Sequence, residues 1–194
     1  MLRNSHLLSW NTIGAKGYSD GKVIAPMCRD FPDLTKCKKC DSIFWLSGLK
    51  EIGTFDYGKK EQSEWPDADD AEFLGLDDYF RALDTGIAKT NANELFIRFR
   101  ILWAYNDRYR KCTDMFIDKN DEKKWKENCE KIVALVDQSD IGNKLLVAEI
   151  KRNFGDFQGC LDIINSIDDS KYNFLKKKFI EECEKGNRWV ICFR

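Results

Sequence analysis

The chain has 194 residues, of which 43% are hydrophobic, with 13 Phe, 6 Trp and only 3 Pro. This composition excludes disordered, collagen-like and low-complexity proteins and predicts a globular protein, for which we favour two domains. A net charge of −1 supplies no overall field that would attract nucleic acid or a membrane surface. The single histidine, His6, argues against histidine-based triads and multi-histidine metal sites.

The charge is distributed unevenly along the chain. Residues 1–60 carry a net charge of +4, residues 61–90 carry −7 and residues 91–194 carry +2. We therefore expect a small β-rich unit over residues 1–60, an acidic joint with one helix over 61–90, and a helical domain over 91–194. The expected fold class is α+β but mainly α.

Short strands are predicted in the first 60 residues. The Asp20-Gly21 pair lies between short apolar segments of residues 10–24 and predicts a β-hairpin. Residues 43–46 form a short apolar run, and residues 51–55 alternate with period two, so both favour strands. A unit of this size buries little apolar surface, so a metal ion would usefully stabilise it.

Helical periodicity begins near residue 76. The first helix is expected to end at Gly86, and the next helix to begin with a capping box formed by Asn91 and Glu94. The alternation of apolar and charged residues near Phe96 makes a strand the alternative interpretation there. Three amphipathic segments follow within residues 125–136, 146–154 and 157–164. A final helix over residues 172–183 would begin after the N-cap Ser170 and stop at Gly186.

The helices have the pattern of an array in which each pair buries its apolar stripe against the next. Residues 145–164 resemble a tetratricopeptide (TPR) repeat, with a tight turn at Gly155 and with Asp156 capping the second helix. No clear 34-residue period extends through the other helices. The helical domain is thus expected to be either a TPR-like antiparallel array or an irregular helical bundle.

The termini and the cysteines predict a location for the protein. The first apolar runs are too short for a signal peptide, and no stretch approaches the ~20 apolar residues of a membrane span. We therefore expect a cytoplasmic protein whose 8 cysteines are free thiols. Five of these cysteines lie in helical or apolar segments and are expected to be buried as small hydrophobic side chains: Cys112, Cys129, Cys160, Cys183 and Cys192.

One group of cysteines in the sequence is a candidate metal site. Cys37 and Cys40 form a C-x-x-C motif, whose thiolates can share one structural Zn²⁺, and Cys28 is the expected third ligand. For the fourth ligand we rank His6 first, ahead of Asp30, Asp41, water or a partner residue. A redox-active C-x-x-C and a surface turn without any ligand are the alternatives.

The residues from Asn11 to Gly21, the run from Ala25 to Cys40, and the segment Ile43-Phe-Trp-Leu support a resemblance. Together they look like the front end of uncharacterised bacterial proteins that join a zinc-ribbon-like C-x-x-C knuckle to TPR-like helices. The resemblance implies Cys37 and Cys40 as metal ligands, and Cys28 less firmly. It implies no activity, and this sequence lacks the second C-x-x-C of a complete zinc ribbon.

Three classes of function follow. The absence of the common catalytic motifs and the helical pattern favour a non-enzymatic scaffold or adaptor that binds a protein or peptide. The alternative is nucleic-acid binding through Arg29, Lys36, Lys38 and Lys39 around the C-x-x-C motif. The third class is an enzyme that uses carboxylates, and its candidate residues are the acidic cluster of Asp67, Asp69, Asp70 and Glu72. No residue of this cluster can be assigned a catalytic role.

Overall fold

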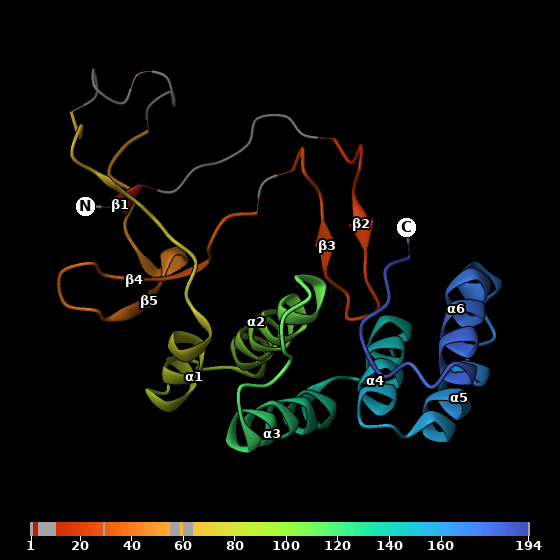
Figure 1. The fold of residues 1–194 in the computed structure, drawn as a ribbon. Coiled ribbons are helices and arrows are strands. Elements are labelled where there is room, and N and C mark those ends of the chain that lie inside the picture. The colour runs from red at the N-terminus through yellow and green to blue at the C-terminus, as the bar shows by residue number, and fades with distance from the viewer. Residues whose placement is uncertain (1, 4–10, 29, 55–58, 60–63, 194) are drawn as a thin grey trace. The chain divides into compact units, whose positions relative to one another are not determined.

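The computed structural model describes residues 2–3, 11–28, 30–54, 59 and 64–193 (Figure 1). Within these residues the chain is 50% helix, with six α-helices and a few short strands near the N-terminus. The expectation of a mainly helical chain is therefore confirmed. None of the helices in the described part of the chain is long and apolar enough to cross a membrane.

The chain divides into two compact units, which we describe separately. The first comprises Met1–Gly14 and Ala25–Ile87, and the second comprises Ala15–Ile24 and Ala88–Arg194. This division differs from the expected one, because the hairpin after Gly14 belongs with the helices instead of with the small β-rich unit. The residues expected to form an acidic joint mostly belong to the first unit.

In its described residues, the first unit contains one α-helix and two pairs of short strands. Strands β1 (Leu2–Arg3) and β6 (Asp69–Asp70) are parallel, whereas β4 (Leu34–Lys36) and β5 (Ile43–Trp45) are antiparallel. A short 3-10 helix (Leu46–Gly48) follows β5, and helix α1 spans Leu76–Asp84. The core of this unit is small and comprises Leu34, Ala68, Leu74, Tyr79 and Ala82.

The strand predicted over residues 51–55 is absent from residues 51–54, and Phe55 lies outside the described residues. The Trp65 ring lies directly over Gly53, at the position where a Cβ atom would be. Residues 51–54 are all exposed, so the alternation of apolar and polar residues there does not mark the buried face of a strand.

The second unit contains five helices and one hairpin. The hairpin pairs β2 (Lys16–Gly17) with β3 (Val23–Ile24), as the Asp20-Gly21 pair predicted. Helices that follow one another along the chain pack together: α2 packs against α3, α4 packs against α5, and α5 packs against α6. The helices are α2 (Asn91–Arg110), α3 (Lys119–Leu135), α4 (Ile141–Asn153), α5 (Phe157–Asn165) and α6 (Asn173–Glu184).

Local sequence signals mark where three of the six described α-helices end. Gly86, Gly155 and Gly186 have φ angles of 65°, 83° and 68°, which favour glycine and terminate α1, α4 and α6. Asp156 caps α5 as predicted, with its carboxylate accepting a hydrogen bond from the Gly159 N–H at 2.9 Å.

Two N-terminal caps differ from the prediction. The cap of α2 is Thr90, one residue before Asn91, because its hydroxyl accepts from the Asn93 N–H at 3.2 Å. Ser170 begins a short 3-10 helix (Ser170–Tyr172) that precedes α6, and the cap of that 3-10 helix is Asp169. The strand reading near Phe96 was wrong, since Phe96 lies in α2.

Buried polar groups attach the β2–β3 hairpin to the helices. Asp20 is 1% exposed, and its Oδ2 accepts from Arg110 at 2.5 Å and from the Asn106 amide at 2.8 Å. Its backbone carbonyl also accepts from Trp103 Nε1 at 3.0 Å. These three partners all lie on α2, so the turn of the hairpin is fixed to that helix.

The C-terminal segment lies along the other side of this hairpin. The Phe193 N–H donates to the Gly17 carbonyl at 2.9 Å, and the Ile191 N–H donates to the Ser19 hydroxyl at 2.8 Å. The buried Glu149 and Arg152 form an ion pair on α4 at 2.5 Å. Burial raises the pKa of Glu149 against the opposing effect of Arg152. Val190 and Ile191 of this segment are buried, so the C-terminal segment packs onto the second unit.

Candidate functional site

The β4–β5 hairpin positions Cys37 and Cys40 on the loop between its two strands. The Cys37 N–H donates to the Ser42 carbonyl at 2.9 Å, and the Asp41 N–H donates to the Cys37 carbonyl at 2.8 Å. Asp41 has a φ angle of 58°, which reverses the chain directly after Cys40. The loop is therefore a tight turn that places both cysteine side chains on one short segment.

Cys37 and Cys40 lie near one another in this turn, and Cys40 Sγ lies 3.3 Å from Ser42 Oγ. Hydrogen bonds from the side chain and backbone of Ser42, and then from Cys37, lower the pKa of the Cys40 thiol. Cys37 is half-buried and Cys40 is exposed, so the pair is accessible to a metal ion in solution. We call Cys37 and Cys40 the thiol pair.

Ion pairs hold the turn against α1. Lys36 lies 2.8 Å from the Asp78 carboxylate and 3.5 Å from that of Asp41. Arg81 pairs with Asp41 and lies 2.9 Å from Asp78. The Arg81 guanidinium lowers the pKa of Asp41, since it favours the charged carboxylate. These four alternating charges fix the residue that follows Cys40.

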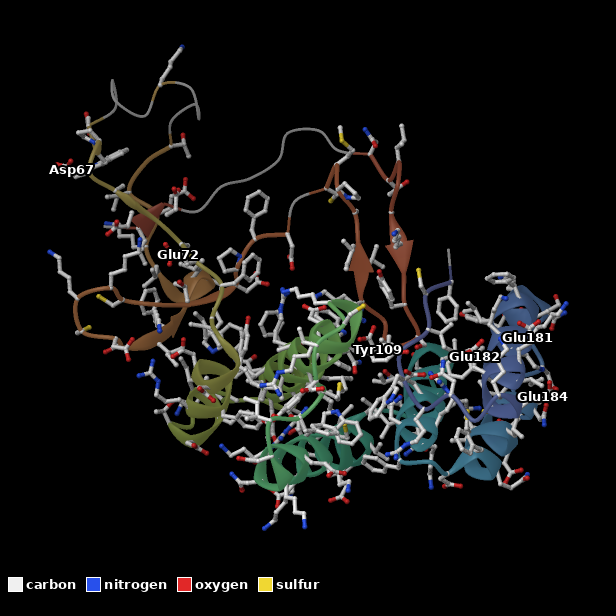
Figure 2. The ribbon with its side chains drawn as sticks, in the orientation of Figure 1. Asp67, Glu72, Tyr109, Glu181, Glu182 and Glu184 are labelled. Carbon is white, nitrogen blue, oxygen red and sulfur yellow. The ribbon has the colours of Figure 1, made fainter. Side chains whose placement is uncertain are left out.

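A second set of charges flanks the turn. Lys38 lies 3.0 Å from Glu72, which is labelled in Figure 2, and 3.6 Å from Asp69. Lys39 is exposed. Of the four basic residues considered for nucleic-acid binding, Lys36 and Lys38 thus contact carboxylates, while Arg29 lies outside the described residues.

The structure places the other expected metal ligands apart from the thiol pair or does not describe them. No group of three or more His, Cys, Asp or Glu side chains suited to hold a metal ion occurs among the described residues. Cys28, which is half-buried, is therefore not brought together with the thiol pair there. His6 lies outside the described residues. Asp41 is engaged by Arg81 and Lys36.

The remaining cysteines follow the prediction only in part. Cys129, Cys160 and Cys183 are buried, as expected. Cys160 and Cys183 are 3.6 Å apart between their sulfur atoms, and burial raises the pKa of both thiols. The expectation was wrong for Cys112 and Cys192, which are exposed. Cys112 follows the last turn of α2 with a φ angle of 55°, outside the helical face.

An aromatic cluster in the second unit was not anticipated. Trp189 lies 6.2 Å from Tyr109, 6.1 Å from Phe116 and 6.2 Å from Trp125 between ring centroids. Trp125 is fully buried, whereas Tyr109 is 39% exposed and Ile117, which follows Phe116, is 81% exposed. Figure 2 labels Tyr109, which lies in the last turn of α2.

We call Tyr109, Phe116, Ile117 and Trp189 the aromatic patch. It combines the end of α2 and the loop that directly follows it with the C-terminal segment, which is distant in sequence. The abundance of aromatic residues in the sequence was a signal of such a cluster, but it gave no indication of which ones would meet.

Comparisons with known proteins add no relative. No protein-family model matches the chain, and no significant match exists among curated proteins or solved structures.

Proposed function

We propose that this chain is a non-enzymatic interaction protein. Its helical unit binds a protein or peptide partner, and its thiol pair holds a structural zinc ion. The observation that carries the first part is the aromatic patch, and the convergence of Cys37 and Cys40 in one turn supports the second.

The aromatic patch has the composition of a protein-binding surface. Tyrosine and tryptophan contribute large contact areas with little loss of side-chain entropy and are enriched at interface positions that dominate binding. Tyr109 is partly exposed, and its ring lies against Trp189, which packs on the buried Trp125. Because Trp189 packs on this buried ring, the side chains of the patch are held in place before a partner binds. Ile117, which follows Phe116 in the chain, adds an exposed apolar side chain.

The sequential packing of the helices also supports this proposal. Where each helix packs on its neighbour along the chain, as α4, α5 and α6 do, the helices form an extended surface of the kind that repeat proteins use to bind peptides. A TPR-like relation between these helices is part of the proposal.

The thiol pair fits zinc in its donor chemistry. Zinc favours cysteine thiolates, and structural sites place them about 2.3 Å from the ion. The donors from Ser42 stabilise negative charge on the Cys40 sulfur, as a metal-binding thiolate requires. A bound Zn²⁺ would supply a cross-link between chain segments in a unit with a small apolar core.

Substitution of the most exposed residue of the aromatic patch tests the interaction. The full chain, its Ile117→Asp variant and its Ile52→Asp variant would each be immobilised, and captured proteins quantified by mass spectrometry. Ile52 is a matched control because it is 56% exposed and belongs to the first unit, outside the helical unit proposed to bind the partner. We expect about tenfold lower recovery of a specific partner with Ile117→Asp, corresponding to ~1.4 kcal/mol, and unchanged recovery with Ile52→Asp. Equal recovery by both variants would contradict the proposal.

Nucleic-acid binding through the turn is the less favoured proposal. Contacts with phosphates require lysines that can leave their present partners, and Lys36 and Lys38 each contact two carboxylates. Salt-dependent binding of the full chain to a single-stranded oligonucleotide would reverse this preference.

A further inference from the structure

We propose that one zinc ion joins two copies of this chain, with Cys37 and Cys40 of each copy as its four ligands. This inference rests on the zinc binding proposed above and adds the source of the remaining ligands. Three observations support it: the turn supplies only two of the four ligands that zinc takes, the turn is exposed, and the charges around it are balanced.

The first argument is coordination number. A structural zinc ion takes four ligands in a tetrahedral arrangement, and one turn supplies two thiolates. The described residues contain no third His, Cys, Asp or Glu side chain grouped with the thiol pair. The acids closest to it are already engaged, since Asp41 contacts Arg81 and Lys36, and Glu72 contacts Lys38. A second copy brings two more thiolates of the ligand type that zinc prefers.

The second argument is access. Residues 38–42 are all exposed, so the turn can approach an identical turn without displacing core side chains. The tetrahedral geometry suits two pairs of ligands related by a twofold axis, and twofold dimers are the commonest symmetric assemblies.

The third argument is charge. Two approaching copies meet without strong like-charge repulsion if the surface around each turn is balanced. Four cations and four carboxylates surround the thiol pair: Lys36, Lys38, Lys39 and Arg81 with Asp41, Asp69, Asp78 and Glu72. The four thiolates and the ion would add a net charge of only −2, shared between the two copies.

The test combines metal stoichiometry with molecular mass. The full chain would be stripped of metal with a chelator, kept reduced with a phosphine so that no disulfide can form, and titrated with zinc. Native mass spectrometry and sedimentation velocity would then follow the assembly. We expect the mass to double, with one zinc ion bound per two chains, and we expect a chelator to restore the monomer.

Two variants make this outcome specific. Cys37→Ser is expected to remain a monomer with at least tenfold weaker zinc binding, whereas Cys112→Ser, which changes an exposed cysteine of the other unit, is expected to dimerise normally. Unchanged backbone amide signals from both units in nuclear magnetic resonance spectra would establish that Cys37→Ser is folded, since the helical circular dichroism signal comes mainly from the second unit. A monomer holding one zinc ion per chain would overturn the dimer and leave the proposed zinc site standing. A chain that binds no zinc would overturn both.

Discussion

Replacing Asp20 with asparagine should destabilise the second unit strongly. The Asp20 side chain is 0% exposed and that of Arg110 is 8% exposed, and the two form an ion pair at 2.5 Å. Asp20 also accepts from the Asn106 amide and from the Lys22 N–H, at 2.8 and 3.1 Å. Asparagine keeps the shape but removes the charge, which leaves the buried Arg110 guanidinium paired only with the partly exposed Asp107, at 2.7 Å. Breaking a buried pair costs about 3–5 kcal/mol, and because Asp107 remains we expect the lower end of this range, about 3 kcal/mol.

The assay is urea unfolding of the full chain at neutral pH, followed by circular dichroism. A matched control is Lys22→Met, which removes the ion pair of Lys22 with Asp107 at 2.6 Å, where the side chains are 22% and 28% exposed. This partly exposed pair should contribute about 1 kcal/mol or less. If Asp20→Asn lowers the free energy of unfolding by no more than Lys22→Met does, the argument that Asp20 holds the hairpin to α2 is wrong.

Three further predictions follow from buried or reactive side chains. Phe179→Ala should lower the free energy of unfolding by about 3–5 kcal/mol, because Phe179 is 1% exposed within the α5–α6 core; a loss under about 1 kcal/mol in urea unfolding would contradict this packing. Burial alone would raise the pKa of Asp121, but hydrogen bonds from the Ile117 N–H, Tyr105 and Arg108 outweigh it and lower that pKa. The charged Asp121 carboxylate therefore stabilises the fold at neutral pH, and this contribution to the free energy of unfolding is lost as the pH falls below about 4. The difference in unfolding free energy between the wild type and Asp121→Asn should therefore shrink on acidification, and a constant difference would count against it. Iodoacetamide should label Cys40 before Cys129, as read by peptide mass spectrometry, because Cys40 is exposed with a lowered pKa and burial raises that of Cys129; the reverse order would refute the assignment of the exposed thiol pair.

Local sequence signals predicted much of the secondary structure. The 3.6-residue spacing of apolar side chains located the helices, and glycines at positive φ marked the ends of three of them. The Asp20-Gly21 turn was likewise visible, because its hydrogen bonds join residues close in sequence, such as Tyr18 and Lys22.

The assignment of that hairpin to the helical unit could not be predicted. It depends on a pair of buried charges, Asp20 and Arg110, which are 90 residues apart. No periodicity or composition identifies which aspartate will meet which arginine. The burial of Cys112 was equally unpredictable from the sequence. It lies one residue beyond Lys111, the C-cap of α2, and is therefore exposed instead of buried on the helix.

The candidate site was predictable in its central feature alone. The C-x-x-C spacing located Cys37 and Cys40, because two ligands in one turn are a local property of the sequence. The partners that position the turn, Asp78 and Arg81 of α1, come from about 40 residues further along the chain. The aromatic patch joins α2 with the C-terminal segment and so depends on the tertiary fold.

X-ray absorption spectroscopy at the zinc edge tests the central claim about the thiol pair most directly. The full chain, loaded with zinc under reducing conditions, should show four sulfur atoms at about 2.3 Å from the metal. This result would establish Cys37 and Cys40 as ligands if it disappears in the Cys37→Ser variant and persists in Cys112→Ser. A zinc ion surrounded only by nitrogen and oxygen, or a spectrum unaffected by Cys37→Ser, would contradict the account.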